Sequence, residues 1–126
     1  MQLIVAVALG GALGAVARYL LMGQVEHLAG NEFPWSTLVV NVLGAFLLGV
    51  LLEIFALAWS PSPELRAMLV VGVLGAFTTF STYALDMVFL IERGALLPAL
   101  LYSGASVLLT VAGLIAGMRL FRLLLV

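Results

Sequence analysis

Four long apolar stretches follow one another along the chain and are separated by short polar segments. They cover approximately residues 3–22, 37–58, 65–91 and 97–124. A hydrocarbon core of about 30 Å needs about 20 helical residues to cross it, and every stretch reaches that length. None of the connecting segments is long enough to form a soluble domain. The pattern therefore predicts an all-α integral membrane protein in which residues 1–126 form a single transmembrane domain of four helices.

The composition agrees with a location in the lipid bilayer and excludes several classes of function. Hydrophobic residues make up 65% of the chain and charged residues only 9%, whereas soluble domains carry about 25% charged residues. The five basic residues are all arginines and form no run, so nucleic-acid binding is not expected. The chain has no cysteine, and its single histidine, His27, is expected to be a solvated loop residue because no metal-ligand partners cluster around it.

The arginines give only a weak indication of orientation in the membrane. Four crossings put both termini and the second connection on one side, with Arg66, Arg119 and Arg122, and leave Arg93 and Arg18 on the other. Three positive charges against two is almost no bias under the positive-inside rule, so two interpretations stay open. The protein either inserts in one weakly determined orientation or has dual topology, with copies in both orientations that pair antiparallel.

Small residues recur at four-residue spacing in three of the four stretches. The three sets are Gly10 and Gly14; Gly113 and Gly117; and Asn41, Ala45 and Gly49. Such faces let transmembrane helices approach closely, although a lipid-facing helix also tolerates glycine. Together they predict extensive contact between helices, part of it between the subunits of an oligomer.

The third stretch carries the strongest functional signal in the chain. Residues 72–83 read GVLGAFTTFSTY, with two glycines followed by four hydroxyl side chains other than tyrosine near the expected centre of the bilayer. Because glycine and hydroxyl residues weaken a helix, we expect the third helix to be broken mid-membrane. The alternative is an intact helix whose Ser and Thr side chains bond to the preceding turn. A break frees backbone carbonyls, which must face protein, a cavity or an ion. Carbonyl oxygens without a carboxylate suit a hard cation such as Na⁺ better than Zn²⁺.

Two polar residues in the first and second stretches each have more than one interpretation. Asn41 lies about one turn inside its stretch, on the same side as Thr37. Its amide either joins two helices or donates to a permeating anion. Arg18 lies near the end of the first stretch. It is either an anchor that reaches the membrane surface, or a buried cation that organises a vestibule or pairs with an acid such as Glu53.

A stripe of hydroxyl groups runs along the fourth stretch. Tyr102, Ser106 and Thr110 recur at four-residue spacing, so they share one face of a helix. Such a stripe either joins the helix to a neighbour or forms the wall of a narrow polar path. Phe80 and Tyr83 favour the path, because the edges of aromatic rings carry partial positive charge that suits an anion.

Three segments resemble motifs of the Fluc (CrcB) family of fluoride channels. Residues 72–83 are similar to the family signature Gly-x-x-Gly-x-x-Thr-Thr-Phe-Ser-Thr-Phe. Residues 10–19 (GGALGAVARY) are similar to its first-helix motif, and residues 37–44 (TLVVNVLG) to its second-helix motif Thr-x-x-x-Asn-x-x-Gly. The resemblance extends over all four stretches. It departs at the second aromatic position, where this chain has Tyr83 and the family usually has Phe.

The resemblance implies a dual-topology antiparallel homodimer with two fluoride pathways and a central Na⁺ that is not transported. By motif position, the backbone carbonyls of Gly75 and Thr78 from each subunit hold this structural ion, and Arg18 lies near the aqueous vestibule. The implied ion pathway contains Thr37, Asn41, Phe80, Tyr83, Tyr102, Ser106 and Thr110.

The implied function is that of a fluoride-specific channel in the cell (inner) membrane, and not that of an enzyme. Cytoplasmic fluoride would leave passively, which reduces its toxicity, and the partners would be fluoride, a second copy of the chain and the lipid bilayer. Three alternatives have less support. A small dual-topology transporter of the multidrug-exporter type needs an acid in the first stretch, which contains none. An intramembrane hydrolase needs an intramembrane base, and the only histidine lies in a polar segment. A structural membrane subunit leaves the residues of the third stretch unexplained.

Overall fold

The computed structural model describes residues 1–126 and consists of helices and their connections. Four helical passes are long and apolar enough to cross a membrane: Gln2–Ala29, Trp35–Leu57, Pro63–Glu92 and Leu96–Leu125. The prediction of an all-α chain with four membrane-capable helices is confirmed. The first helix continues beyond the apolar stretch and ends at Ala29, where it is followed by Gly30 with φ 79°, a value that glycine adopts readily. His27 was expected in a loop; it lies instead in the exposed last turn of this helix.

Three of the passes are single helices, and the third pass is divided. The single helices are α1 (Gln2–Ala29), α2 (Trp35–Leu57) and α6 (Leu96–Leu125). The third pass consists of α3 (Pro63–Ala67), the π-helix η1 (Met68–Leu74), α4 (Gly75–Phe77) and α5 (Phe80–Glu92). Thr78 and Thr79 separate α4 from α5, near the middle of the pass. We call these two residues the interruption.

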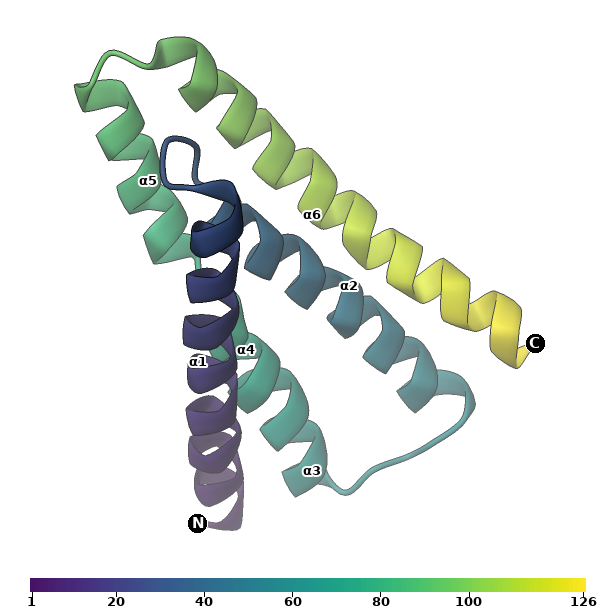
Figure 1. Ribbon diagram of the computed structural model, residues 1–126. Coiled ribbons are helices and arrows are strands. Elements are labelled where there is room, and N and C mark those ends of the chain that lie inside the picture. The colour runs from purple at the N-terminus through teal and green to yellow at the C-terminus, as the bar shows by residue number, and fades with distance from the viewer.

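The four passes run alternately in opposite directions. Both termini and the connection at residues 58–62 lie toward one end of the molecule, and the connections at residues 30–34 and 93–95 lie at the other (Figure 1). α2 and α6 lie side by side over most of their length, α1 packs against η1 and α4, and α5 lies beside the beginning of α6. This arrangement brings the middle of the third pass close to the beginning of α2.

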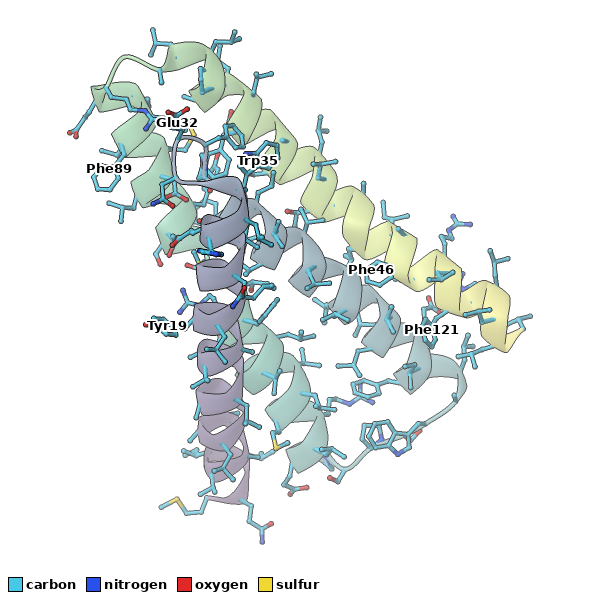
Figure 2. The ribbon with its side chains drawn as sticks, viewed as in Figure 1. Tyr19, Glu32, Trp35, Phe46, Phe89 and Phe121 are labelled. Atoms are coloured by element: carbon cyan, nitrogen blue, oxygen red, sulfur yellow. The ribbon has the colours of Figure 1, made fainter.

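The contact between α2 and α6 depends on glycines that let the two backbones touch. A Cβ atom at Gly49 would meet the carbonyl oxygen of Leu114, and a Cβ atom at Gly117 would meet that of Phe46. Phe46 lies where the two helices run together (Figure 2). We call this contact the α2–α6 seam. At Gly49 and Gly117, the predicted small-residue faces of the second and fourth stretches therefore form a helix contact within one chain.

The glycines of the first stretch make a second contact of the same kind. A Cβ atom at Gly10 would meet the carbonyl oxygen of Met68, and one at Gly14 would meet that of Val73. Gly72 approaches from the other side, since a Cβ atom built there would lie 2.9 Å from the Cα atom of Gly10. α1 and η1 are thus packed backbone to backbone. Contact between subunits through these faces stays a prediction.

The outside of the molecule is covered with apolar side chains. Only 18 of 126 residues are buried within the chain, so most of its apolar side chains are not covered by the chain itself. Tyr19 on α1 and Phe89 on α5 point away from the rest of the molecule (Figure 2). A surface of this kind is stable against lipid or against another protein surface, as expected of a multi-pass membrane protein.

Candidate functional site

At the interruption the backbone leaves the helix for two residues. Thr78 has φ −88° and ψ 156°, and Thr79 has φ −151° and ψ 113°, so both are extended. The side-chain oxygen of Thr79 accepts a hydrogen bond from the backbone N–H of Thr82 and so caps the start of α5. The hydroxyl of Thr79 also donates to the Thr82 hydroxyl over 3.0 Å. The third pass therefore stops and restarts at threonine, where the sequence predicted a break.

Asn41 of α2 supports the interruption from the neighbouring helix. Its Oδ1 accepts a hydrogen bond from the backbone N–H of Thr79 at 2.7 Å, and its Nδ2 donates to the backbone carbonyl of Thr79 at 3.0 Å. One amide side chain thus satisfies both backbone groups of a residue that has left the helix. These bonds join α2 to the third pass, as the first interpretation of Asn41 predicted. An amide nitrogen has a second N–H, which is left as a donor beside these two bonds.

The interruption changes the partners of two backbone carbonyls. In a continuous α-helix the carbonyl of Gly75 would accept from the N–H of Thr79 and that of Thr78 from the N–H of Thr82. Here the Thr79 N–H donates to Asn41 and the Thr82 N–H donates to the Thr79 hydroxyl. Both carbonyls lose their helical donors. No group of three His, Cys, Asp or Glu side chains is placed to hold a metal, so neutral backbone oxygens are the groups here that suit a hard cation.

A cavity of about 510 Å³ opens beside the interruption. The hydroxyl of Ser106 on α6 is buried and has no hydrogen-bond partner in the chain. Gly44 lies behind the interruption, where a Cβ atom would meet the Thr78 side chain. The polar and aromatic side chains that line the cavity are Asn41, Thr78, Thr79, Phe80, Tyr83, Ser106 and Thr110. This grouping joins residues from α2, the third pass and α6 into one neutral, donor-bearing wall.

The aromatic side chains form a row next to the cavity. The ring centroids of Phe80 and Tyr83 lie 5.3 Å apart, and those of Tyr83 and Tyr102 lie 5.1 Å apart. Phe80 is 80% exposed although it follows directly on the interruption. Its ring therefore projects from the chain beside the polar backbone, available to an ion or to a second copy of the protein.

Two of the predicted pathway residues lie outside the lining of this cavity. Tyr102 is fully buried and donates a hydrogen bond from its hydroxyl to Asp86 Oδ2 at 2.8 Å. Thr37 is also buried, with 1% of its surface exposed. Tyr102 belongs to a small core with Leu38, Leu90 and Ala99. The structure thus brings together Asn41, Phe80, Tyr83, Ser106 and Thr110 but places Tyr102 and Thr37 behind them.

Arg18 lines a separate hollow of about 570 Å³, together with Glu26 of α1 and Thr82 of α5. Its Nε atom is buried and has no hydrogen-bond partner in the chain. The possible pairing of Arg18 with Glu53 is wrong. Glu53 is buried and forms an ion pair with Arg122 at 2.9 Å, because the ends of α2 and α6 meet there.

Sequence reasoning did not identify Asp86 and Thr79 as supports of the site. Asp86 accepts the hydrogen bond that fixes the Tyr102 hydroxyl. Thr79 was one hydroxyl among several, and its backbone is the group that Asn41 binds. An acid three residues after Tyr83 on the same helix was the one available signal for Asp86.

Comparisons with known proteins agree with the sequence resemblance. The model of one protein family, described as CrcB-like protein, Camphor Resistance (CrcB), matches residues 5–118. A fluoride-specific ion channel FluC of Rhodospirillum centenum is 55% identical over 122 residues, which is 97% of each chain. One of Agrobacterium fabrum is 50% identical over 116 residues, covering 92% of this chain and 93% of the relative. One of Hahella chejuensis is 48% identical over 122 residues, covering 97% of this chain and 96% of the relative.

Proposed function

The chain belongs to the Fluc (CrcB) family of membrane proteins, and from this membership we propose that it is a fluoride-specific channel through which cytoplasmic fluoride leaves the cell passively. The relatives named above are fluoride-specific ion channels that match nearly the whole chain. In a bacterial cell the protein lies in the inner membrane and lowers the toxicity of fluoride.

The observation that carries this proposal is the neutral, donor-bearing cavity at the interruption. Fluoride is small and strongly hydrated, so a pathway must replace its lost water with several donors at once, yet not hold the ion too tightly to release it. The unpartnered hydroxyl of Ser106, the Thr110 hydroxyl and the second N–H of Asn41 are such donors. The rings of Phe80 and Tyr83 add edges of partial positive charge.

Each remaining pathway residue has a part in this proposal. Arg18 attracts fluoride to the aqueous hollow that it lines with Thr82. Tyr102, held by Asp86, keeps the ring of Tyr83 in place from behind. Thr37 is buried on α2, about one helical turn before Asn41. Because no permanent charge lines the cavity itself, an anion that enters is not trapped there.

The working unit is an antiparallel homodimer of dual topology with two pathways. The support is physical: the interruption leaves polar backbone beside the exposed Gly75 and Phe80, and such backbone is not stable against lipid. A second copy that covers this face encloses the cavity. The nearly even division of arginines between the two ends favours insertion in both orientations.

The chain's natural lack of cysteine allows a direct test of the dual topology. A single cysteine in place of the exposed Glu92 should react with a membrane-impermeant thiol reagent from both sides of the membrane, in about equal amounts. Labelling from one side only would contradict the dual topology.

A structural Na⁺ held by the carbonyls of Gly75 and Thr78 of both subunits completes the proposal. The support is that these two carbonyls lose their helical donors at the interruption, and that neutral oxygen ligands suit a hard monovalent cation. Such an ion would supply positive charge that offsets the carbonyl dipoles where the two subunits meet. Asn41, Thr79 and Thr82 hold the backbone in the conformation that presents the two carbonyls.

The function is tested by ion efflux from liposomes that contain the purified protein. Vesicles loaded with fluoride or chloride are diluted into ion-free buffer, and efflux is followed with ion-selective electrodes, with protein-free vesicles as the control. We expect fast loss of fluoride without loss of chloride and without a proton gradient. Equal loss of both anions, or a requirement for a proton gradient, would contradict a fluoride-specific channel.

A further inference from the structure

Both ends of the Asn41 amide make hydrogen bonds at the interruption, and these bonds affect the proposed cation site. Its Oδ1 accepts from the Thr79 N–H at 2.7 Å and its Nδ2 donates to the Thr79 carbonyl at 3.0 Å. A residue whose only task was to donate to an anion would need neither bond. The carbonyl oxygen of the amide cannot donate at all, and the shorter of the two bonds is the one it makes.

The bond to the Thr79 N–H decides whether the carbonyl of Gly75 is available. Thr79 lies four residues after Gly75, so in a continuous helix its N–H would bind that carbonyl. Asn41 binds this N–H and keeps Thr79 extended, with φ −151°. If Asn41 did not accept it, the nearest way to satisfy the buried N–H would be to re-form the helical bond to Gly75. The second bond, to the Thr79 carbonyl, fixes the same residue on its other side.

We propose that Asn41 is a positioning residue for the cation site: by holding the N–H of Thr79 it keeps the carbonyl of Gly75 free for Na⁺. This inference rests on the structural Na⁺ of the proposed function. Asn41 also keeps its second N–H for the anion pathway, so one side chain of α2 links the cation site to the cavity beside it. Loss of Asn41 should therefore weaken Na⁺ binding as well as fluoride flux.

The test compares the thermal stability of the purified protein in NaCl and in N-methyl-D-glucamine chloride. Asn41→Leu keeps the size of the side chain and removes both hydrogen bonds. We expect the Na⁺ concentration that gives half of the stabilisation to rise on the order of tenfold, which corresponds to the loss of one hydrogen bond of ordinary strength. Asn41→Asp still accepts from the Thr79 N–H, and it should keep the stabilisation by Na⁺.

A matched control separates this role from a role in the anion pathway. Ser106 lines the same cavity but makes no bond to the interruption. Ser106→Ala should lower fluoride flux and leave the response to Na⁺ unchanged. A merely structural role of Asn41 would lower the melting temperature equally in both salts, without a change in the Na⁺ concentration needed.

The outcomes distinguish this inference from the proposed function. If Asn41→Leu responds to Na⁺ as the wild type does, the positioning role is wrong and the cation site stands. If the wild type shows no stabilisation by Na⁺ over the organic cation, the cation site fails and the positioning role with it, while the efflux experiment still decides the channel function. Should Asn41→Leu not fold, Asn41→Ala removes the same bonds without adding an apolar group, and the same expectation applies to it.

Discussion

The α2–α6 seam and the interruption of the third pass show two opposite ways of building a helix contact within one chain. At the seam both helices are continuous, and Gly49 and Gly117 let their backbones touch. At the interruption the helix gives up two of its own hydrogen bonds, and their N–H donors bind Asn41 of the neighbouring helix and the Thr79 hydroxyl instead. The seam gains stability from close packing, whereas the interruption exposes donors and carbonyls that packing alone would hide. Close packing and accessible polar backbone are therefore found in different parts of the chain.

The largest effect is expected from a bulky side chain in the seam. In Gly117→Val the new Cβ would meet the carbonyl oxygen of Phe46, which is backbone and cannot move aside without separating the helices. We expect a loss of stability of about 3 kcal/mol or more, measured by unfolding of the purified protein. Gly11→Val is the control, because a Cβ at Gly11 meets nothing within 4 Å. Equal stability of both variants would mean that the seam is not what holds α2 and α6 together.

A change at the interruption should affect flux rather than folding. Phe80→Ile removes the ring beside the cavity, and because Phe80 is 80% exposed the chain loses little internal packing. Fluoride efflux should fall on the order of 100-fold, which corresponds to about 2.7 kcal/mol, with the oligomeric state unchanged in size-exclusion chromatography. Phe89→Ile, on the same helix but pointing away from the molecule, should conduct normally. Normal efflux through Phe80→Ile would remove this ring from the pathway.

The ion pair near the C-terminal ends of α2 and α6 should have a moderate effect. Arg122→Gln leaves the buried carboxylate of Glu53 without its partner, but the Arg122 side chain is 57% exposed, so solvent already screens the pair. We expect a loss of about 1–2 kcal/mol, less than for a fully buried pair. The double variant with Glu53→Gln should recover part of it, since no unpaired charge remains. Arg119→Gln, in the same turn region of α6, is the control and should change stability little. A double variant no more stable than Arg122→Gln would show that charge pairing is not the cause.

The smallest effect is expected at Tyr83, where the chain differs from the signature that residues 72–83 resemble. Tyr83→Phe keeps the ring that packs between Phe80 and Tyr102 and removes only the hydroxyl. If the ring edge is what matters, fluoride efflux should change by less than about threefold, which is below the strength of an ordinary hydrogen bond. A fall of more than about tenfold would instead assign the hydroxyl a direct contact with the ion.

Much of the fold follows from local properties of the sequence. The four passes were predicted because each is a long apolar stretch, and the length needed to cross a bilayer is a property of the stretch itself. The position of the interruption followed in the same way from the glycine and hydroxyl residues of the third pass. The π-helix η1 was not predicted, because it contains no residue pattern that distinguishes it from an α-helix and lies where α1 packs against Gly72.

The partners within the site could not be predicted from the sequence. Asn41 and Thr79 are 38 residues apart, Tyr102 and Asp86 are 16 apart, and Arg122 and Glu53 are 69 apart. Which of them meet depends on how far each helix is rotated and shifted against its neighbours, and one residue of shift turns a helix by about 100°. Arg18 illustrates the difficulty. The sequence offered Glu53 as an acidic partner for Arg18, but the contact between α2 and α6 pairs Glu53 with Arg122.

The sequence alone determined that this protein lies in a membrane, that it crosses four times and that its third pass carries polar chemistry, because each of these depends on residue type and local spacing. Only the tertiary structure decided that Asn41 binds the backbone of Thr79 at the interruption and that Ser106 and Thr110 line the same cavity as Phe80. It also decided that Tyr102 is buried outside the lining of that cavity. These relations belong to the packing of separate helices, where close contacts between glycines and the backbone of the neighbouring helix set the distances.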